Sequence, residues 1–311
     1  MHAPRRPNAA LIYGALLLHT LISSGTYLFA KHALTEIPAL PLGLLRFTGA
    51  SVALTLLLLK LRPPGKRLPP PEARRKVLLL AFVAVPLNQG FFLYGLQLST
   101  AAHAALLYTL TPLIVLLLAQ ALLGEFPGWR AALGTALALA GTSWVLLSTR
   151  DLAHGTPGSV RGDLLLLIAV LAWAIYTAEG RTLVSEHGAL ATIAWTLIGG
   201  TILYLPFGVG SLFVGNNWSR VVNAPLEAWG GIAYLSLITS VVSYLLWYWA
   251  LKYLLAARVA VFTNLQPIGT ALLAEIFLGE RLTLQFAIGS ALVIGGVLLA
   301  QLRQARTKPA I

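Results

Sequence analysis

Apolar residues occupy the chain in long runs, separated by short breaks rich in charge, proline or glycine. Each run has roughly 18–25 residues, about the length that a helix needs to cross a bilayer. The pattern predicts an all-α integral membrane protein with ten transmembrane helices. The predicted spans are 10–30, 40–60, 77–97, 102–123, 129–149, 162–181, 188–213, 229–251, 258–278 and 283–302.

The composition supports a membrane protein and narrows its chemistry. Apolar residues make up 58% of the chain and charged residues 10%, with a mean hydropathy of +0.80. A soluble domain carries about 25% charged residues. The absence of cysteine excludes disulfides, thiolate catalysis and cysteine-ligated metals. No connecting segment is long enough for a separate domain, so the function is expected within the bilayer.

The basic residues are distributed unevenly between the predicted loops. The formal net charge is +12, and one set of alternating segments carries 16 of the 22 Lys and Arg residues, against five in the other set. Cytoplasmic loops of membrane proteins carry an excess of Lys and Arg, so both termini are expected in the cytoplasm. The chain itself is expected in the inner (plasma) membrane. The basic segment 60–76 is interpreted as a topology anchor rather than a nucleic-acid or specific-lipid site. The expected partners of the chain are a small-molecule substrate and the surrounding membrane lipid, with no nucleic acid.

Part of the chain repeats itself. Segment 96–141 aligns without a gap with segment 251–296, and the informative matches are Pro112 with Pro267, Gly124 with Gly279, Glu125 with Glu280, Gly134 with Gly289 and Gly141 with Gly296. The repeat divides the chain into halves 1–150 and 151–311, each with five predicted spans. An odd number of spans inverts the second half, an arrangement typical of alternating-access transporters with a central cavity. A purely structural bundle is the alternative.

Several motifs resemble the EamA-type proteins of the drug/metabolite transporter superfamily. They are the segment from Ser24 to Lys31, Glu36-Ile37-Pro38, Leu45-Arg46-Phe47, Thr111-Pro112, Leu123-Gly124-Glu125, Gln266-Pro267 and Leu278-Gly279-Glu280-Arg281. The resemblance covers essentially the whole chain. It implies ten helices in two inverted repeats, a central cavity, and export of small metabolites. The bacterial amino-acid exporters called YddG are the branch that the chain resembles most, with a weaker resemblance for the substrate than for the fold.

Polar and aromatic side chains inside the predicted spans are the candidates for the substrate site, because polar groups in lipid are costly and usually face the interior of the bundle. The candidate substrate-binding residues are His19, Ser23, Tyr27, Asn88, Gln89, Tyr108, Trp173, Tyr176, Tyr244, Tyr248 and Asn264. A structural reading stays open for each, since hydroxyl groups bond to their own helix and aromatic rings simply pack.

Four repeated residues are candidates for structure or gating. Pro112 and Pro267 each remove a helical hydrogen bond near mid-span, which predicts either a hinge or a static kink. Glu125 and Glu280 end spans four and nine, where a carboxylate pairs with Lys or Arg or caps the next helix. Arg46 lies inside span two, and its expected partners are carbonyl groups or a carboxylate.

These patterns favour a secondary transporter over an enzyme. The sequence has no paired intramembrane aspartates, no His-Glu-x-x-His motif and no Walker loop, so neither a metal nor a cofactor is expected. The expected substrate is a neutral amino acid, with a preference for larger apolar or aromatic side chains and no fixed counter-charge in the site. The alternatives are a transporter of drugs, nucleosides or cofactors, a channel, and a membrane scaffold. A monomer fits the sequence, and the oligomeric state stays open.

Overall fold

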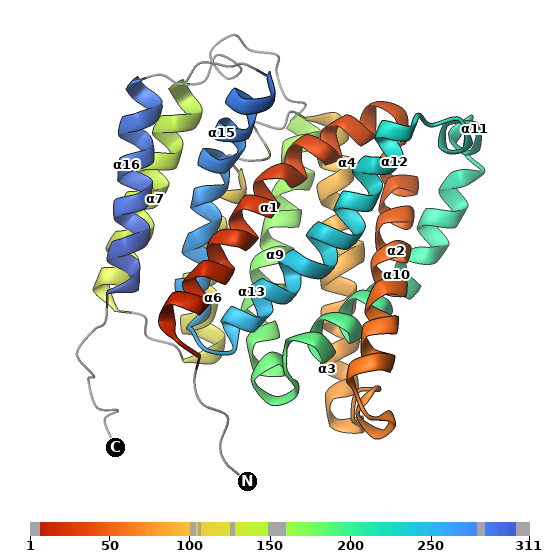
Figure 1. Ribbon diagram of the computed structural model, residues 1–311, viewed down its shortest axis with the longest axis horizontal. Coiled ribbons are helices and arrows are strands. Elements are labelled where there is room, and N and C mark those ends of the chain that lie inside the picture. The colour runs from red at the N-terminus through yellow and green to blue at the C-terminus, as the bar shows by residue number, and fades with distance from the viewer. Residues whose placement is uncertain are drawn as a thin grey trace.

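The computed structural model describes residues 7–99, 104, 107–124, 128–148, 160–278 and 284–302, and the regular secondary structure in these ranges is helical. The chain forms an elongated bundle whose long helices run roughly in one direction (Figure 1). In the first half the elements are α1 (Ala9–Glu36), α2 (Ala39–Leu61), η1 (Pro64–Lys66), α3 (Pro71–Phe82), η2 (Val83–Gly90), α4 (Phe91–Leu98), α6 (Thr111–Leu123) and α7 (Trp129–Ser148). The second half contains α9 (Val160–His187), α10 (Ala189–Leu212), α11 (Asn217–Val222), α12 (Leu226–Ala233), η3 (Tyr234–Ser243), α13 (Tyr244–Leu251), α14 (Ala256–Ala260), η4 (Val261–Leu265), α15 (Gln266–Leu278) and α16 (Leu284–Gln301).

Within the described ranges, six helical segments are long and apolar enough to cross a membrane. They are Ala9–Glu36, Ala39–Leu61, Pro71–Leu98, Val160–His187, Ala189–Leu212 and Leu226–Leu251, and shorter apolar helices cover Thr111–Leu122 and Ala287–Ala300. Large apolar side chains also lie on the outside, including Leu56 and Phe207, which are 62% and 60% exposed. An apolar exterior suits lipid, so the prediction of a multi-pass helical membrane protein is confirmed.

The ends of the helices follow from local sequence. Asn8 precedes α1, and its Oδ1 accepts a hydrogen bond from the Ala10 backbone nitrogen at 3.2 Å. Proline comes directly before α2 and α12, at Pro38 and Pro225, where it does not interrupt helical hydrogen bonding. Gly188, with φ of +81°, allows the chain to turn between α9 and α10 within a single residue.

Two of the long spans widen near their centres. Helix α3 continues through the π-helical segment η2 into α4, and α12 continues through the π-helical segment η3 into α13. Pro86 lies inside η2 and lacks the N–H that an α-helix would use, which accounts for the widening there. In η3 the Ser240 hydroxyl donates to the Leu235 carbonyl, five residues earlier, at 2.8 Å. Both segments face the middle of the bundle and contribute residues to the cavity described below.

The repeated prolines lie in the first turn of a helix. Pro112 is the second residue of α6, which begins after a turn at Thr109 and Leu110, and Pro267 is the second residue of α15, which follows the 3₁₀ segment η4. First-turn N–H groups have no partner within the helix, so these positions tolerate proline. The expected loss of a mid-helix hydrogen bond is therefore corrected: each predicted span is interrupted just before its proline, and a new helix starts there. The glutamates Glu125 and Glu280 lie outside the described residues.

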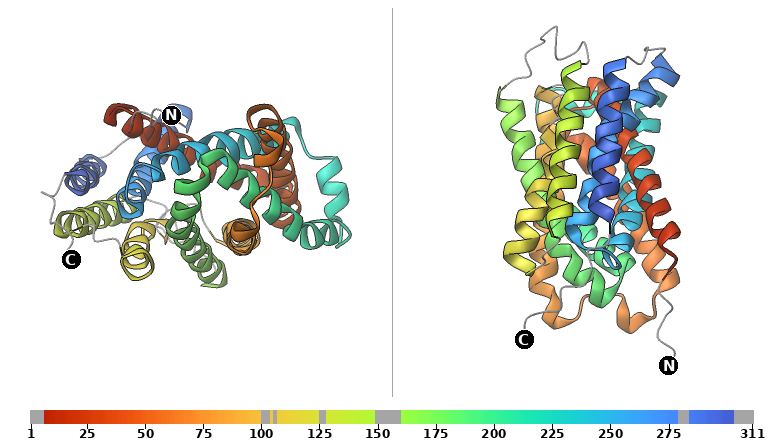
Figure 2. Two further views of the ribbon diagram at one scale, coloured as in Figure 1. Left: turned by 90° about the horizontal axis from the view of Figure 1, so that it is seen from below. Right: turned by 90° about the vertical axis from the view of Figure 1, so that its left-hand side faces the viewer.

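Helices α7 and α16 lie side by side at one edge of the bundle, as two views show (Figures 1 and 2). Their closest approaches are at glycines. A Cβ atom on Gly134 would lie 2.5 Å from the carbonyl oxygen of Gly296, and one on Gly141 would lie 2.7 Å from that of Gly289. The two pairs run in opposite directions along the chain, so the helices are antiparallel.

Candidate functional site

A cavity lies between the two halves of the chain. It is lined by His19, Ser23, Thr26 and Tyr27 of α1, Arg46 of α2, Gln89 of η2, Phe92 of α4, Tyr108, Trp173 of α9, Thr239 of η3, Tyr244 of α13 and Gln266 of α15. The volume open to water within it is about 60 Å³. This leaves room for a few water molecules. The lining is mostly aromatic rings, hydroxyl groups and amides, with one guanidinium group.

Helix α1 is joined to η3 by a buried polar network. His19 Nδ1 lies 3.0 Å from the carbonyl oxygen of Ser243 and 2.7 Å from its Oγ, while His19 Nε2 lies 3.4 Å from Ser23 Oγ. Because a carbonyl oxygen only accepts, the first contact favours a proton on Nδ1. One turn further along, the hydroxyl groups of Thr26 and Thr239 are 3.0 Å apart. These contacts hold the two halves together along one wall of the cavity.

A second polar group joins η2 to the opposite wall. Asn88 is fully buried, and its Nδ2 donates to the Ala169 carbonyl at 2.7 Å and to the Tyr108 hydroxyl at 3.1 Å. Gln89 Nε2 donates to Asn88 Oδ1, whereas Gln89 Oε1 is buried and has no hydrogen-bond partner. Asn88 therefore positions Tyr108 and Gln89, and these two side chains line the cavity.

Three aromatic rings line the cavity toward the end of the bundle where α1 ends. Tyr27, Phe92 and Tyr108 form a cluster with centroid separations of 5.6–6.1 Å and interplanar angles of 74–80°. Edge-to-face packing of this kind stabilises aromatic pairs by about 0.5–1.5 kcal/mol beyond burial. The Tyr27 hydroxyl donates to Gln266 Oε1 at 3.2 Å, which fixes the ring in place. We call these three residues the upper aromatic cluster.

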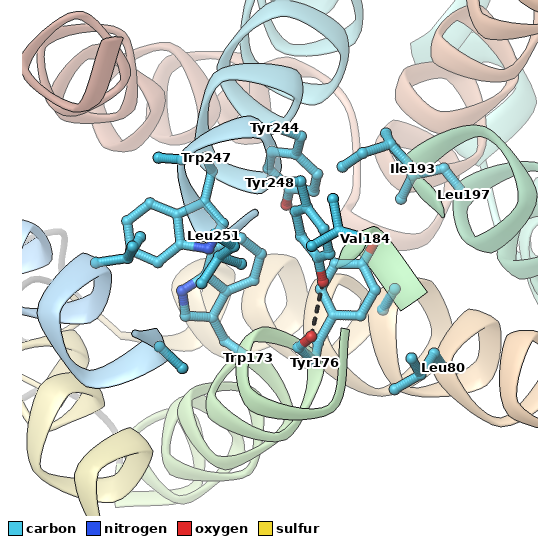
Figure 3. Close-up of a cluster of buried hydrophobic side chains, with 14 of the residues drawn as sticks. Leu80, Trp173, Tyr176, Val184, Ile193, Leu197, Tyr244, Trp247, Tyr248 and Leu251 are labelled. Carbon is cyan, nitrogen blue, oxygen red and sulfur yellow. Dashed lines mark hydrogen bonds between the residues drawn. The ribbon is translucent and has the colours of Figure 1, made fainter. Parts of the chain in front are cut away.

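A larger set of aromatic rings packs together beside the cavity (Figure 3). This lower aromatic cluster consists of Trp173, Tyr176, Tyr244, Trp247 and Tyr248, with centroid separations of 5.0–5.9 Å. Trp173 and Tyr244 face the cavity. Trp247 packs against His19, with the two ring centroids 4.6 Å apart. The upper and lower clusters occupy partly equivalent places in the sequence repeat. The repeat aligns each residue with the one 155 positions later, which pairs Phe92 with Trp247.

The structure gathers seven of the predicted substrate-site residues around the cavity and places four elsewhere. His19, Ser23, Tyr27, Gln89, Tyr108, Trp173 and Tyr244 line it, and Asn88 lies directly behind the lining. Tyr176 and Tyr248 lie outside the lining and pack in the core, where the Tyr176 hydroxyl lies 2.6 Å from Thr196 Oγ1 and the Tyr248 hydroxyl donates to the Tyr176 carbonyl at 2.7 Å. Asn264 lies in η4, fully buried and outside the lining.

Five lining residues were not selected from the sequence, namely Thr26, Arg46, Phe92, Thr239 and Gln266. Phe92 lies one turn after Asn88, a spacing that places both on one helical face. Thr239 precedes Tyr244 by five residues, and the π-helical geometry of η3 brings them to the same side. Arg46 corrects the expectation of a site without fixed charge.

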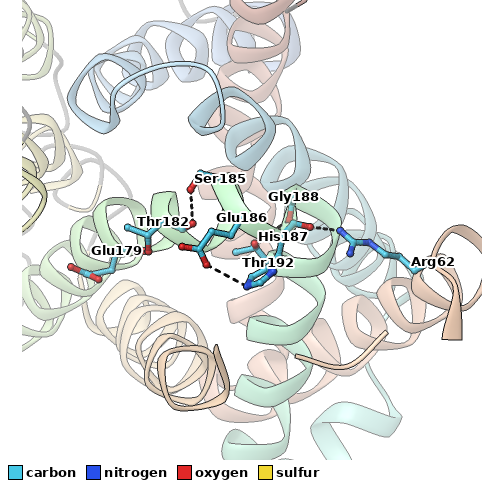
Figure 4. A network of polar contacts seen from close by, with 8 residues as sticks. All are labelled: Arg62, Glu179, Thr182, Ser185, Glu186, His187, Gly188 and Thr192. Carbon is cyan, nitrogen blue, oxygen red and sulfur yellow. Dashed lines mark hydrogen bonds and ion pairs between the residues drawn. The ribbon is translucent and has the colours of Figure 1, made fainter. Parts of the chain in front are cut away.

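Polar contacts hold the helices together at the end where α1 begins and α16 ends (Figures 1 and 4). Arg62 donates to the carbonyl oxygen of His187, and Trp195 Nε1 donates to the carbonyl of Arg67 at 2.7 Å. Lys76 Nζ of α3 forms an ion pair with Glu179 of α9 at 2.6 Å. The basic segment 60–76 therefore bonds to α9 and α10 at this end.

Comparison with known proteins assigns the class. The model of the EamA-like transporter family matches residues 10–147 and again residues 160–302. A chain with this fold and a cavity between its halves is a multi-pass membrane transporter. The chain belongs to the EamA-like transporter family.

Individual relatives agree with this assignment. The uncharacterized transporter YetK of Bacillus subtilis is 28% identical and covers 94% of this chain and 87% of its own length. A protein of Streptantibioticus cattleyicolor, named a probable terminal-alkyne amino-acid exporter, is 26% identical over 84% of each chain. A solved crystal structure matches with a TM-score of 0.75 at 22% identity, covering 93% of this chain and 96% of that chain. This last likeness concerns the fold alone.

Proposed function

We propose that this transporter exports neutral amino acids, preferably those with larger apolar or aromatic side chains, through the central cavity. The observation that carries the proposal is the lining itself: Trp173, Tyr244, Phe92 and Tyr108 offer aromatic faces beside hydroxyl and amide groups. Aromatic faces accommodate apolar side chains, and the polar groups bond to the ends of a zwitterion. The amino-acid exporter among the relatives supports the same class of substrate.

The proposed architecture has ten spans in two inverted halves, 1–150 and 151–311. Three observations support it: the family model matches twice, a π-helical segment occurs at a corresponding place in each half, and the glycine contacts of α7 and α16 are reciprocal. The sequence repeat aligns Gly134 with Gly289 and Gly141 with Gly296. Exchanging the halves therefore converts the contact of Gly134 with Gly296 into that of Gly289 with Gly141, as expected for a two-fold axis.

The two aromatic clusters support alternating access as the mechanism. Residues of both clusters line the cavity, which has space for only a few waters in the described conformation. A substrate has to separate one cluster at a time. Pro112 and Pro267 begin α6 and α15 where their spans are interrupted, which makes these points suitable hinges.

The proposed orientation places both termini in the cytoplasm and the chain in the inner (plasma) membrane. Helix α1 begins and α16 ends at the same end of the bundle as the segment from Arg62 to Lys76 (Figure 1). Seven Lys and Arg residues lie in segment 60–76. Such a concentration is typical of cytoplasmic loops. The lower aromatic cluster then faces the cytoplasm.

Competition in proteoliposomes tests the substrate. Purified protein is reconstituted with unlabelled phenylalanine inside, and uptake of labelled phenylalanine is measured in the presence of phenylalanine, leucine, threonine, a sugar phosphate or a quaternary ammonium drug. Phenylalanine and leucine should compete best. No counterflow of labelled phenylalanine, leucine or threonine, with counterflow of the labelled phosphate or drug in parallel vesicles, would overturn the amino-acid proposal and favour another metabolite or drug.

A further inference from the structure

The central cavity contains a buried cation, Arg46. Its side chain comes from α2, lines the cavity and is 1% exposed. Its guanidinium lies 4.9 Å from the centroid of the neighbouring Phe47 ring. The geometry points to Arg46 as the binding site for the carboxylate group of the transported substrate. This inference rests on the proposed transport through the same cavity.

One edge of the guanidinium is fixed by the other half of the chain. Arg46 Nε donates to Ser240 Oγ at 2.9 Å, and Ser240 Oγ itself donates to the Leu235 carbonyl at 2.8 Å. The single hydroxyl proton of Ser240 is thus committed to Leu235, and a lone pair faces Arg46. The π-helical turn of η3 therefore orients the guanidinium while supplying no negative charge.

The Tyr244 side chain also hydrogen-bonds to the guanidinium, but none of the described cavity-lining residues supplies a negative charge. Arg46 Nη1 is buried and has no hydrogen-bond partner. The cavity lining contains neither Asp nor Glu, and the two ion pairs found in the described ranges join other residues, Lys76 with Glu179 and Glu186 with His187. A buried charge without a partner is strongly destabilising, and an ionised side chain inside a membrane protein usually marks a ligand path. An anion in the cavity would remove this cost.

A carboxylate fits this arrangement. The partnerless Nη1 can donate a charge-assisted hydrogen bond to a carboxylate oxygen, and the planar guanidinium suits the geometry of a carboxylate. Tyr244 and Trp173 lie 5.3 Å apart between ring centroids and leave apolar faces for the remainder of the substrate. The side chain of the substrate then packs on these rings while its carboxylate contacts Arg46.

The partners available to an ammonium group are weaker. Gln89 Oε1 is a buried acceptor without a partner, and the aromatic rings offer cation-π contacts, but the lining holds no anion. The site therefore selects for the carboxylate more strongly than for the ammonium group. Neutral amino acids and simple monocarboxylates are both accepted, whereas amides and cationic amines are rejected.

Three compounds with the same side chain separate these contributions. Labelled leucine counterflow is measured in proteoliposomes against leucine, leucinamide, which lacks the carboxylate, and 4-methylpentanoate, which lacks the ammonium group. In the native chain, leucinamide should compete at least tenfold more weakly than the other two. Arg46→Gln should weaken competition by leucine about tenfold to a hundredfold, because a hydrogen bond to a charged group is lost. The same variant should no longer prefer leucine to leucinamide. Arg46→Lys, which keeps the charge without the fork, should be intermediate.

The matched control is Arg220→Gln, since Arg220 bonds to the Thr35 carbonyl at 2.8 Å far from the cavity. It should behave like the native chain. If leucine is transported but leucinamide competes equally well, Arg46 is no carboxylate site, and amino-acid export survives. A requirement for chloride together with equal competition would assign Arg46 to an inorganic anion and overturn the inference.

Amino-acid export can also fail while the carboxylate site at Arg46 survives. If the native chain carries no amino acid, amino-acid export is wrong. Uptake of 4-methylpentanoate that depends on Arg46 would then still support the carboxylate site, and its absence would overturn both proposals. The competition series in the native chain decides the question even if Arg46→Gln does not fold.

Discussion

Gly134 of α7 and Gly296 of α16 contact each other backbone to backbone, with room for no side chain between them. A Cβ atom on Gly296 would lie 2.6 Å from the carbonyl oxygen of Gly134 and 2.6 Å from the Ala138 backbone nitrogen. Backbone atoms cannot move aside as the end of a flexible side chain can. Close contacts of this kind between small residues drive helix association in membranes, where the hydrophobic effect is absent.

Gly296→Ala should therefore destabilise the protein, while Gly295→Ala should not. Gly295 has nothing within 4 Å of the added Cβ. Overpacking costs about 1–3 kcal/mol, which should appear as a lower melting temperature of the purified protein in detergent for Gly296→Ala only. Equal melting temperatures for the two variants would argue against the close packing of α7 and α16.

The ion pair between Lys76 and Glu179 should contribute modestly to stability. Its side chains are 34% and 26% exposed, so water screens the charges. Lys76→Gln and Glu179→Gln should each lower the free energy of unfolding, and a double-mutant cycle should give a coupling of about 0.2–1 kcal/mol. The charge exchange Lys76→Glu with Glu179→Lys should restore part of the lost free energy of unfolding. Strict additivity of the single variants would show that the pair is not formed.

The orientation can be tested with introduced cysteines, because the chain contains none. Gly65 and Asn216 are both exposed. Gly65 belongs to the segment that joins α2 to α3, Asn216 directly precedes α11, and these two segments lie at opposite ends of the bundle (Figure 1). An impermeant thiol reagent added to intact cells should label Asn216→Cys and not Gly65→Cys, with the reverse in inside-out vesicles. Labelling of Gly65→Cys from outside would contradict cytoplasmic termini.

Trp173 should matter for transport in a way that an exposed tryptophan does not. Trp173 contacts the cavity and the ring of Tyr244, whereas Trp218 is 61% exposed on α11. Trp173→Phe should preserve folding and raise the KM for phenylalanine several-fold, because less aromatic surface meets the substrate. Trp218→Phe should change neither folding nor the KM for phenylalanine. Identical kinetics for the two variants would remove Trp173 from the site.

The long helices could be predicted from the sequence because the length of an apolar run reports directly on the bilayer. The π-helical segments were not predicted: Pro86 is a signal for η2, but η3 contains no proline, and its residues are as apolar as those of an ordinary span. For the same reason Thr239 escaped notice: its face is set by the π turn. Arg46 was recognised as unusual, but its partner Ser240 lies 194 residues away in the other half.

The aromatic residues show a second limit of the sequence. Trp173, Tyr176, Tyr244 and Tyr248 have similar depth in their spans, and sequence alone gives no difference between them. Packing decides: the hydroxyl groups of Tyr176 and Tyr248 are bonded within the core, whereas Trp173 and Tyr244 face the cavity. Asn264 was chosen for its polarity, yet the 3₁₀ segment η4 holds it away from the lining.

The central claim is that the cavity between the two halves holds the transported amino acid. Substrate protection of a cysteine at Thr239 tests it most directly, because Thr239 lines the cavity and the native chain offers no other thiol. In the Thr239→Cys variant, saturating phenylalanine should slow modification by a small thiol reagent at least several-fold, and modification should stop counterflow. Ser219→Cys, on exposed α11, should be modified at the same rate with or without phenylalanine. Active counterflow in a Thr239→Cys protein that is fully modified, or modification unaffected by phenylalanine while transport proceeds, would contradict the claim.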